Sequence, residues 1–202
     1  MAHDLIFKRA AHGYDWNQFH EDGRGAQWPA EYMVRHASLH ARHHPGRYAL
    51  DIGAGGGAHT RMLLEMGYSV TALDVSPAAC EGLMQRYGKH DMGVRCADIT
   101  EAGLATNAYD LVIDNLTLTH IEHPPWEDII RCLKPGGCIL TAQFGVRHES
   151  LPDSWCHLPA LCDRGFESLE YVRHVRDKWR DEGRKIEFTI GVSRYINEPR
   201  KC

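Results

Sequence analysis

The stretch from Ala49 to Ala58, ALDIGAGGGA, decides the fold of this chain. Its first four residues form an apolar run that is typical of a buried parallel strand, and glycines follow at positions 53, 55, 56 and 57. Glycines in such a turn permit positive φ and let a ligand approach the backbone. A helix predicted after them presents free N–H groups and the positive end of its dipole to an anion. The stretch therefore predicts a strand, a ligand-binding loop and a helix.

Two acids follow this loop at positions that suit a nucleoside. Asp74 lies 21 residues beyond Gly53, at the end of the second predicted strand and before Val75. A carboxylate there is placed to accept hydrogen bonds from two ribose hydroxyls. Asp98 and Ile99 follow the third predicted strand, where an acid can accept from an adenine amino group and a branched side chain can cover the adenine face. The pattern predicts a cofactor that carries ribose and adenine.

The loop alone does not distinguish between two such cofactors, because residues 53–58 also satisfy the dinucleotide fingerprint G-x-G-x-x-A. Three features favour S-adenosylmethionine over a nicotinamide cofactor. They are Asp51 two residues before the first glycine, a third glycine at Gly57, and the pair Asp98 and Ile99. A dehydrogenase would also need a substrate domain, for which little chain remains.

Strand and helix patterns alternate through the middle of the chain, which predicts a parallel sheet with helices on both faces. The chain is expected to be one domain, with a lid and a helix over 1–46, a cofactor-binding core over 47–145 and a substrate-side segment over 146–202. Residues 167–182 fit either a helix or a strand. The predicted strands are 48–52, 69–73, 93–96, 109–113, 138–142 and 186–195, and the predicted helices are 29–43, 58–66, 77–88 and 125–132.

The core resembles the class I S-adenosylmethionine-dependent methyltransferases. The resemblance rests on DIGAGGG (51–57), Asp74, Asp98 with Ile99, YDLVIDNLTL (109–118) and LKPGG (133–137), in the order and spacing of that family. It implies a doubly wound, mostly parallel, seven-stranded Rossmann-like α/β sheet with an antiparallel last strand, for which 186–195 is the candidate. It also implies S-adenosylmethionine as cofactor, held by Asp51, Gly53, Gly55, Gly57, Asp74, Val75, Asp98, Ile99 and Asn115.

Methyl transfer from a sulfonium is an in-line displacement that depends on alignment and on exclusion of water, so no catalytic triad is expected. The aromatic leader is expected to bound the acceptor pocket with Tyr14, Trp16 and Trp28. His120 and His123, after the fourth predicted strand, are the candidate bases. The leader also loosely resembles the corresponding segment of the compact thiol, thiopurine and tellurite methyltransferases, which bears only on substrate size.

A small molecule is the expected methyl acceptor. The chain has a net charge of -4, and no additional domain that could recognise a macromolecule is expected in it. Nucleic acid is therefore not the expected partner, and residues 114–117 lack the Asn/Asp-Pro-Pro-aromatic motif of base-amine methyltransferases. Two alternatives stay open. One is an RNA or protein methyltransferase that uses the basic segment 35–47, and the other is a non-catalytic module that binds the cofactor.

Neither a membrane segment nor a metal site is expected. No window approaches 18 consecutive apolar residues, and the seven cysteines form no C-x-x-C pair, which favours a reducing cytoplasm. His36, His40 and His44 recur at helical spacing, but no acid or cysteine accompanies them at ligand spacing. The sequence leaves the oligomeric state open.

Overall fold

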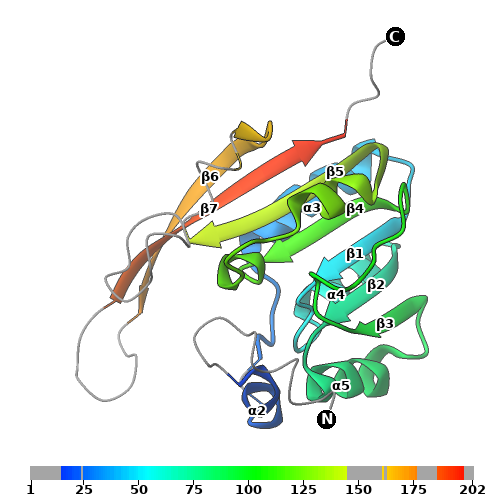
Figure 1. Cartoon of the computed structure of the whole chain (residues 1–202), viewed down its shortest axis with the longest axis vertical. Helices are drawn as coiled ribbons and strands as arrows, with labels where there is room; N and C mark the ends of the chain where they lie inside the picture. The colour runs from blue at the N-terminus through cyan, green and yellow to red at the C-terminus, as the bar shows by residue number, and fades with distance from the viewer. Residues whose placement is uncertain (1–14, 24, 145–160, 162, 177–185, 198–202) are drawn as a thin grey trace.

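The computed structural model describes residues 15–23, 25–144, 161, 163–176 and 186–197 (Figure 1). Its centre is a seven-stranded sheet in the order β3-β2-β1-β4-β5-β7-β6. The first five strands pair in parallel, β7 runs antiparallel to β5, and β6 runs antiparallel to β7. The strands are β1 (Tyr48–Ile52), β2 (Ser69–Asp74), β3 (Met92–Cys96), β4 (Tyr109–Asn115), β5 (Leu133–Phe144), β6 (Glu167–Arg176) and β7 (Ile186–Ile196).

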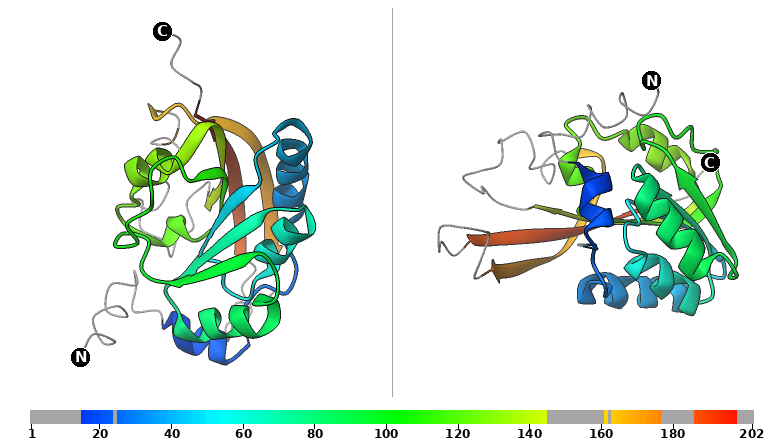
Figure 2. Two further views of the ribbon diagram at one scale, coloured as in Figure 1. Left: turned by 90° about the vertical axis from the view of Figure 1, so that its right-hand side faces the viewer. Right: turned by 90° about the horizontal axis from the view of Figure 1, so that it is seen from below.

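Helices cover both faces of the parallel part of the sheet (Figure 2). One face packs against α3, α4 and α5, and the other packs against α6. No helix among the described residues is long and apolar enough to cross a membrane. The helices are α2 (Trp16–Glu21), α3 (Glu31–His43), α4 (Ala58–Glu65), α5 (Pro77–Tyr87) and α6 (Trp126–Arg131), with a short 3-10 turn η2 (Leu118–His120).

Strict alternation along the strands explains these two layers, because successive side chains point to opposite faces of the sheet. Leu111 and Ile113 of β4 belong to the core under α3 and α4. Val112 belongs to the core under α6, with Trp126 and Ile129. All three β4 side chains are fully buried, so β4 is the central strand around which both cores form.

The predicted mostly parallel sheet with an antiparallel last strand is confirmed. The segment left open between helix and strand forms β6 over 167–176, and residues 177–182 lie outside the described part. The strand expected at 138–142 extends further, from Leu133 to Phe144. The reason is that residues 136 and 137 bond to the residue that follows β7: the N–H of Gly136 donates to the Asn197 carbonyl, and the N–H of Asn197 donates to the Gly137 carbonyl.

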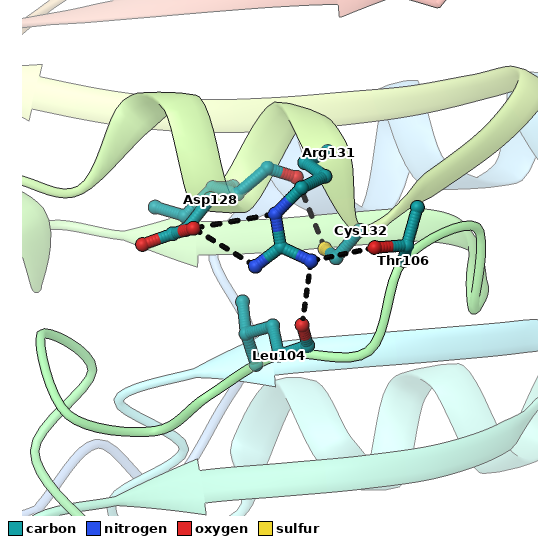
Figure 3. A network of polar contacts seen from close by, with 6 residues as sticks. Leu104, Thr106, Asp128, Arg131 and Cys132 are labelled. Atoms are coloured by element: carbon teal, nitrogen blue, oxygen red, sulfur yellow. Dashed lines mark hydrogen bonds and ion pairs between the residues drawn. The ribbon is translucent and has the colours of Figure 1, made fainter.

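Arg131 at the end of α6 fastens the loop that leads into β4 (Figure 3). Its guanidinium donates to the Leu104 carbonyl at 3.0 Å and to the Thr106 hydroxyl at 2.7 Å. Asp128, one turn earlier on α6, accepts from the same guanidinium at 2.8 Å and fixes its orientation. The loop between Ile99 and β4 is therefore tied to the layer that covers the sheet.

The histidine row on α3 is partly a packing feature. His40 is buried with its Nδ1 2.9 Å from the Tyr68 hydroxyl, and its ring stacks on His44 at 4.2 Å between centroids. Burial lowers the pKa of His40 to about 4. No group of three metal-ligating side chains occurs within the described ranges.

The core role of β4 can be tested with Leu111→Ala. Leu111 is fully buried, so its truncation leaves a cavity between the sheet and α3, and we expect a loss of about 2 to 5 kcal/mol in the free energy of unfolding. Leu39→Ala, at an exposed position of α3, is the matched control and should change stability by less than about 0.5 kcal/mol. Urea denaturation measures both, and equal losses would contradict the two-layer core.

Candidate functional site

A cavity of about 270 Å³ opens at the carboxyl ends of β1, β2 and β4. β1 and β4 are neighbours in the sheet, and the chain leaves β1 toward β2 on one side and leaves β4 toward β5 on the other, so a crevice forms between the two connections. Its walls come from α2, the loop after β1, the ends of β2 and β3, and the loop after β4. The lining residues are Trp16, Phe19, His20, Gly25, Ala26, Ile52, Gly53, Ala54, Gly55, Gly56, Ala58, His59, Leu73, Asp74, Val75, Ala97, Asp98, Ile99, Asn115, Leu116, Thr117, His120 and Ile121.

Glycine is required in the loop after β1 for steric reasons. Gly53 has φ +67°, and a Cβ placed on it would lie 1.9 Å from Oγ1 of Thr117. Gly57 has φ +84° at the start of α4, and a Cβ there would lie 2.7 Å from Leu83. Gly53 and Gly55 line the cavity, whereas Gly57 makes the turn into α4 without lining it.

Asp74 joins the end of β2 to the glycine loop. One carboxylate oxygen accepts from the N–H of Gly55 at 2.8 Å, and the other accepts from the N–H of Ser76 at 2.8 Å. Each carboxylate oxygen can accept a second bond, so the side chain keeps acceptor capacity toward the cavity that it lines. The structure thus fixes this acid where the sequence predicts a ribose acceptor.

The far end of the cavity carries the two residues expected at adenine. Ile99 is buried and Asp98 is half-buried, and both line the cavity with Val75. Asp98 accepts from the backbone N–H of Thr100 at 2.9 Å and from its hydroxyl at 2.8 Å. An acid and a branched apolar side chain therefore lie on one wall.

Asp51 is placed behind the site, outside the cavity lining. Its side chain is 2% exposed and accepts from the Thr60 hydroxyl at 2.6 Å, which ties β1 to α4. Burial is the main cause that raises the pKa of Asp51 to about 7, and the charges of Asp74 and Asp114 add to it. The structure places this acid as a support for the loop, which differs from the cofactor contact expected from the sequence.

Asp114 is a second buried support, and the sequence analysis did not single it out. One oxygen accepts from the N–H groups of Thr117 and Leu118 at 2.9 and 3.0 Å. The other accepts from Thr141 and Gln143 at 2.6 Å each. Burial raises its pKa to about 6. An acid at the end of an otherwise apolar strand was the signal available in the sequence.

The structure brings together only some of the residues expected around the acceptor. Trp16 and His120 both line the cavity, with ring centroids 5.1 Å apart in an edge-to-face arrangement. His123 is exposed and lies outside the cavity lining. Trp28 is 75% exposed and lies outside the cavity lining, whereas Gly25, three residues earlier, lies next to Gly56 of the glycine loop. Tyr14 lies outside the described residues.

Asn115 is at the end of β4, where it lines the cavity and takes part in a contact between elements. Its side-chain oxygen accepts from the Tyr32 hydroxyl at 2.8 Å. Tyr32 belongs to the first turn of α3, so this bond connects the end of β4 to the helix beneath the sheet. The prediction placed Asn115 just after the strand, and the structure includes it as the last strand residue.

Two histidines of the cavity lining, His20 and His59, were given no role by the sequence analysis, and Phe19 was expected only as part of the aromatic leader. Phe19 and His20 belong to α2, which is held on the core by Asn17. The side-chain oxygen of Asn17 accepts from the Ser76 hydroxyl at 3.1 Å and from the N–H of Ala78 at 2.9 Å. Burial lowers the pKa of His20. α2 has only six residues, and their sequence pattern does not indicate which side of the helix faces the cavity.

Comparison with known proteins agrees with this geometry. A family profile described as a methyltransferase domain matches residues 50–141, which run from β1 to β5 and include the glycine loop, Asp74 and Asp98. The sheet order and the cavity at the switch between β1 and β4 are those of the class I fold. Residues 50–141 thus match the methyltransferase-domain family, and the fold is that of the S-adenosylmethionine-dependent methyltransferases of class I.

Individual relatives were also found. The chain is 32% identical over 115 residues to a malonyl-[acyl-carrier protein] O-methyltransferase from Serratia marcescens and 36% identical over 123 residues to one from Anoxybacillus flavithermus. These alignments cover 55% and 57% of this chain, and they span 44% and 47% of the relatives. The chain therefore spans about half the length of these curated relatives.

Among solved structures, the N-methyltransferase NodS from Bradyrhizobium japonicum, in complex with S-adenosyl-L-homocysteine, superposes with a TM-score of 0.64. Its sequence is 18% identical, and the match covers 91% of this chain and 99% of that chain. At this identity the likeness supports the fold.

The raised pKa of the buried Asp51 can be tested by measuring how the stability of the fold depends on pH. A carboxyl whose pKa is raised from 3.8 to about 7 on folding contributes stability that is fully present below the unfolded pKa and lost as pH rises through about 7. Asp51→Asn keeps an oxygen to accept from Thr60 and does not titrate. Its stability relative to the wild type should therefore rise between about pH 4 and 7 and level off above, as measured by urea denaturation at each pH.

A stability difference between Asp51→Asn and the wild type that does not vary with pH would contradict the raised pKa of Asp51.

Proposed function

We propose that this chain binds S-adenosylmethionine in the cavity at the switch point and transfers its methyl group to a small-molecule acceptor. The observation that carries the proposal is that a glycine loop, a fixed acid at the end of β2 and an adenine-type wall all line one cavity. When bound, the cofactor supplies a methyl group on a sulfonium, which is electrophilic without further activation. The methyltransferase-domain match over residues 50–141 supports the same choice of cofactor, as does the likeness in fold to an N-methyltransferase in complex with S-adenosyl-L-homocysteine.

The fit can be judged from the chain's own groups. Asp74 has acceptor capacity for ribose hydroxyls, and Ile99 offers an apolar surface with Asp98 beside it for a base amino group. The glycines of the loop carry no side chains that would fill the space next to the start of α4. These groups match the ribose, adenine and methionine parts of the cofactor.

The acceptor would be held between α2 and the loop after β4. Trp16, Phe19 and Ile121 supply apolar surface that excludes water. His120, in η2, is the residue that we propose as a base, because imidazole is the side chain that most often accepts protons in catalysis. Asp114 helps to position His120, because its carboxylate accepts from the N–H groups of Thr117 and Leu118 just before it in the chain.

A carrier-bound carboxylate is the second candidate acceptor, since the relatives include two malonyl-[acyl-carrier protein] O-methyltransferases. A free carboxylate acceptor needs donors rather than a base, and the described lining residues include no lysine or arginine. The small neutral or thiol-bearing acceptor is therefore the first choice. We place the reaction in a reducing cytoplasm, because Cys80, Cys132 and Cys138 are buried free thiols.

Cofactor binding is tested by titration calorimetry of the chain with S-adenosylhomocysteine and with NAD. We expect binding of S-adenosylhomocysteine alone, and tight binding of NAD without S-adenosylhomocysteine would overturn the proposal. Asp74→Ala removes the ribose acceptor and should weaken binding by about 1.5 to 3 kcal/mol. Asp91→Ala, at an exposed position, is the matched control and should bind as the wild type does.

The acceptor class is tested by release of S-adenosylhomocysteine in the presence of thiols, thiopurines, tellurite, amines and a malonyl thioester on acyl-carrier protein. We expect turnover with a small molecule and a reduced kcat in His120→Asn at unchanged affinity for S-adenosylhomocysteine. Turnover with the carrier-bound substrate alone would favour the second candidate. Absence of methyl transfer to any acceptor in a lysate supplied with labelled cofactor would favour a non-catalytic module.

A further inference from the structure

His59 is a cavity residue to which the proposed function has given no role. It is the second residue of α4 and follows the glycine loop directly after Ala58. The residue is 7% exposed and nevertheless lines the cavity. Buried polar groups are normally hydrogen-bonded, so a partner is expected for each of the two ring nitrogens of this buried imidazole.

The hydrogen bond at Nε2 fixes which nitrogen carries the proton. The backbone N–H of Ala30 lies 3.1 Å from Nε2 and can only donate, so Nε2 is the acceptor and carries no hydrogen. Burial lowers the pKa of His59 to about 4, which keeps the ring neutral in the physiological range. The single ring proton is therefore on Nδ1, and His59 is a neutral N–H donor.

This donor has no partner in the described part of the chain. The bond from Ala30 uses Nε2 alone. The polar side-chain atoms that are both buried and unpaired in that part of the chain belong to His40, Gln143 and Arg194. Nδ1 of His59 is therefore unpaired without being among these enclosed atoms, and the residue that carries it lines the cavity.

We propose that the Nδ1–H group of His59 donates a hydrogen bond to the carboxylate of the cofactor's methionine part, an inference that rests on the proposed function. The carboxylate is the one anionic group of S-adenosylmethionine. The eight-residue helix α4 directs the positive end of its dipole to the same place. The ribose end of the cavity is already assigned to Asp74, so the methionine part lies toward the glycine loop and His59.

The electrostatics of the cavity favour a neutral donor in this role. The described lining residues contain no lysine or arginine that could pair with the carboxylate. A cation at this position would also repel the sulfonium and the ammonium of the same cofactor. A neutral imidazole N–H binds the carboxylate without that repulsion, and its partner bond to Ala30 holds the ring in a fixed orientation.

His59 also has a structural role that an experiment must separate from ligand binding. Its Nε2 satisfies the N–H of Ala30, which is the N-cap residue of α3. His59→Phe removes both the acceptor and the donor at similar volume. His59→Gln keeps one acceptor oxygen and one donor N–H group on a flexible chain, so it can replace both bonds.

The test compares two ligands that differ in the carboxylate alone. S-adenosylhomocysteine and its decarboxylated analogue, S-adenosyl-3-thiopropylamine, are titrated by calorimetry into the wild type, His59→Phe and His59→Gln. In His59→Phe we expect affinity for S-adenosylhomocysteine to fall by about 10- to 100-fold, while affinity for the decarboxylated analogue stays close to that of the wild type. His59→Gln should recover most of the preference for the carboxylate.

Several outcomes would overturn the inference. If His59→Phe weakens both ligands equally, the residue acts through the structure alone, and if it weakens neither, no bond to the carboxylate exists. Binding of neither ligand by the wild type would overturn the cofactor assignment, and this inference with it. Circular dichroism checks folding, and His59→Met replaces the Phe variant if that variant does not fold. His43→Phe, on the exposed end of α3, is the control and should bind both ligands as the wild type does.

Discussion

The close approach of the loop after β1 to its two neighbours is the constraint on which the site depends. The N–H groups of Gly53 and Ala54 both donate to the Leu73 carbonyl of β2, at 2.8 and 3.0 Å, while Gly53 lies against Thr117 from the loop after β4. No side chain fits at Gly53, so the loop can join the ends of β1, β2 and β4 in one place. The cavity exists because these three strand ends converge there.

The acids of this region form two groups with different tasks. Asp74 and Asp98 line the cavity and keep acceptor capacity toward it. Asp51 and Asp114 are buried behind it, with raised pKa values of about 7 and about 6, and their bonds hold α4 and the loop after β4. Such a buried carboxyl fixes the position of the element that it bonds. It also makes the stability of the fold depend on pH, because burial disfavours its charged form.

The fold and the part of the cavity that is lined by the glycine loop, Asp74 and Asp98 could be predicted from the sequence, because their signals are local. A strand, a glycine turn and a helix are contiguous, and the acids at 74 and 98 are placed by the strands that they end. The part of the cavity where we propose that the acceptor binds depends on how the short helix α2 and the chain after it lie on the sheet, which the pattern of residues does not determine. Trp16 and Trp28 are both tryptophans of the same aromatic leader, yet Trp16 lines the cavity and Trp28 is exposed. His59 is the second residue of a predicted helix, and its tautomer and its unpaired nitrogen can be inferred only once the structure places the N–H of Ala30 beside it.

A crystal structure of the chain with S-adenosylhomocysteine is the most direct test of the central claim that this cavity is a methyl-donor site. The account predicts adenine beside Ile99, ribose hydroxyls on Asp74 and the methionine carboxylate next to the start of α4. A ligand bound elsewhere, or bound in the cavity with its adenine toward the glycine loop, would contradict it.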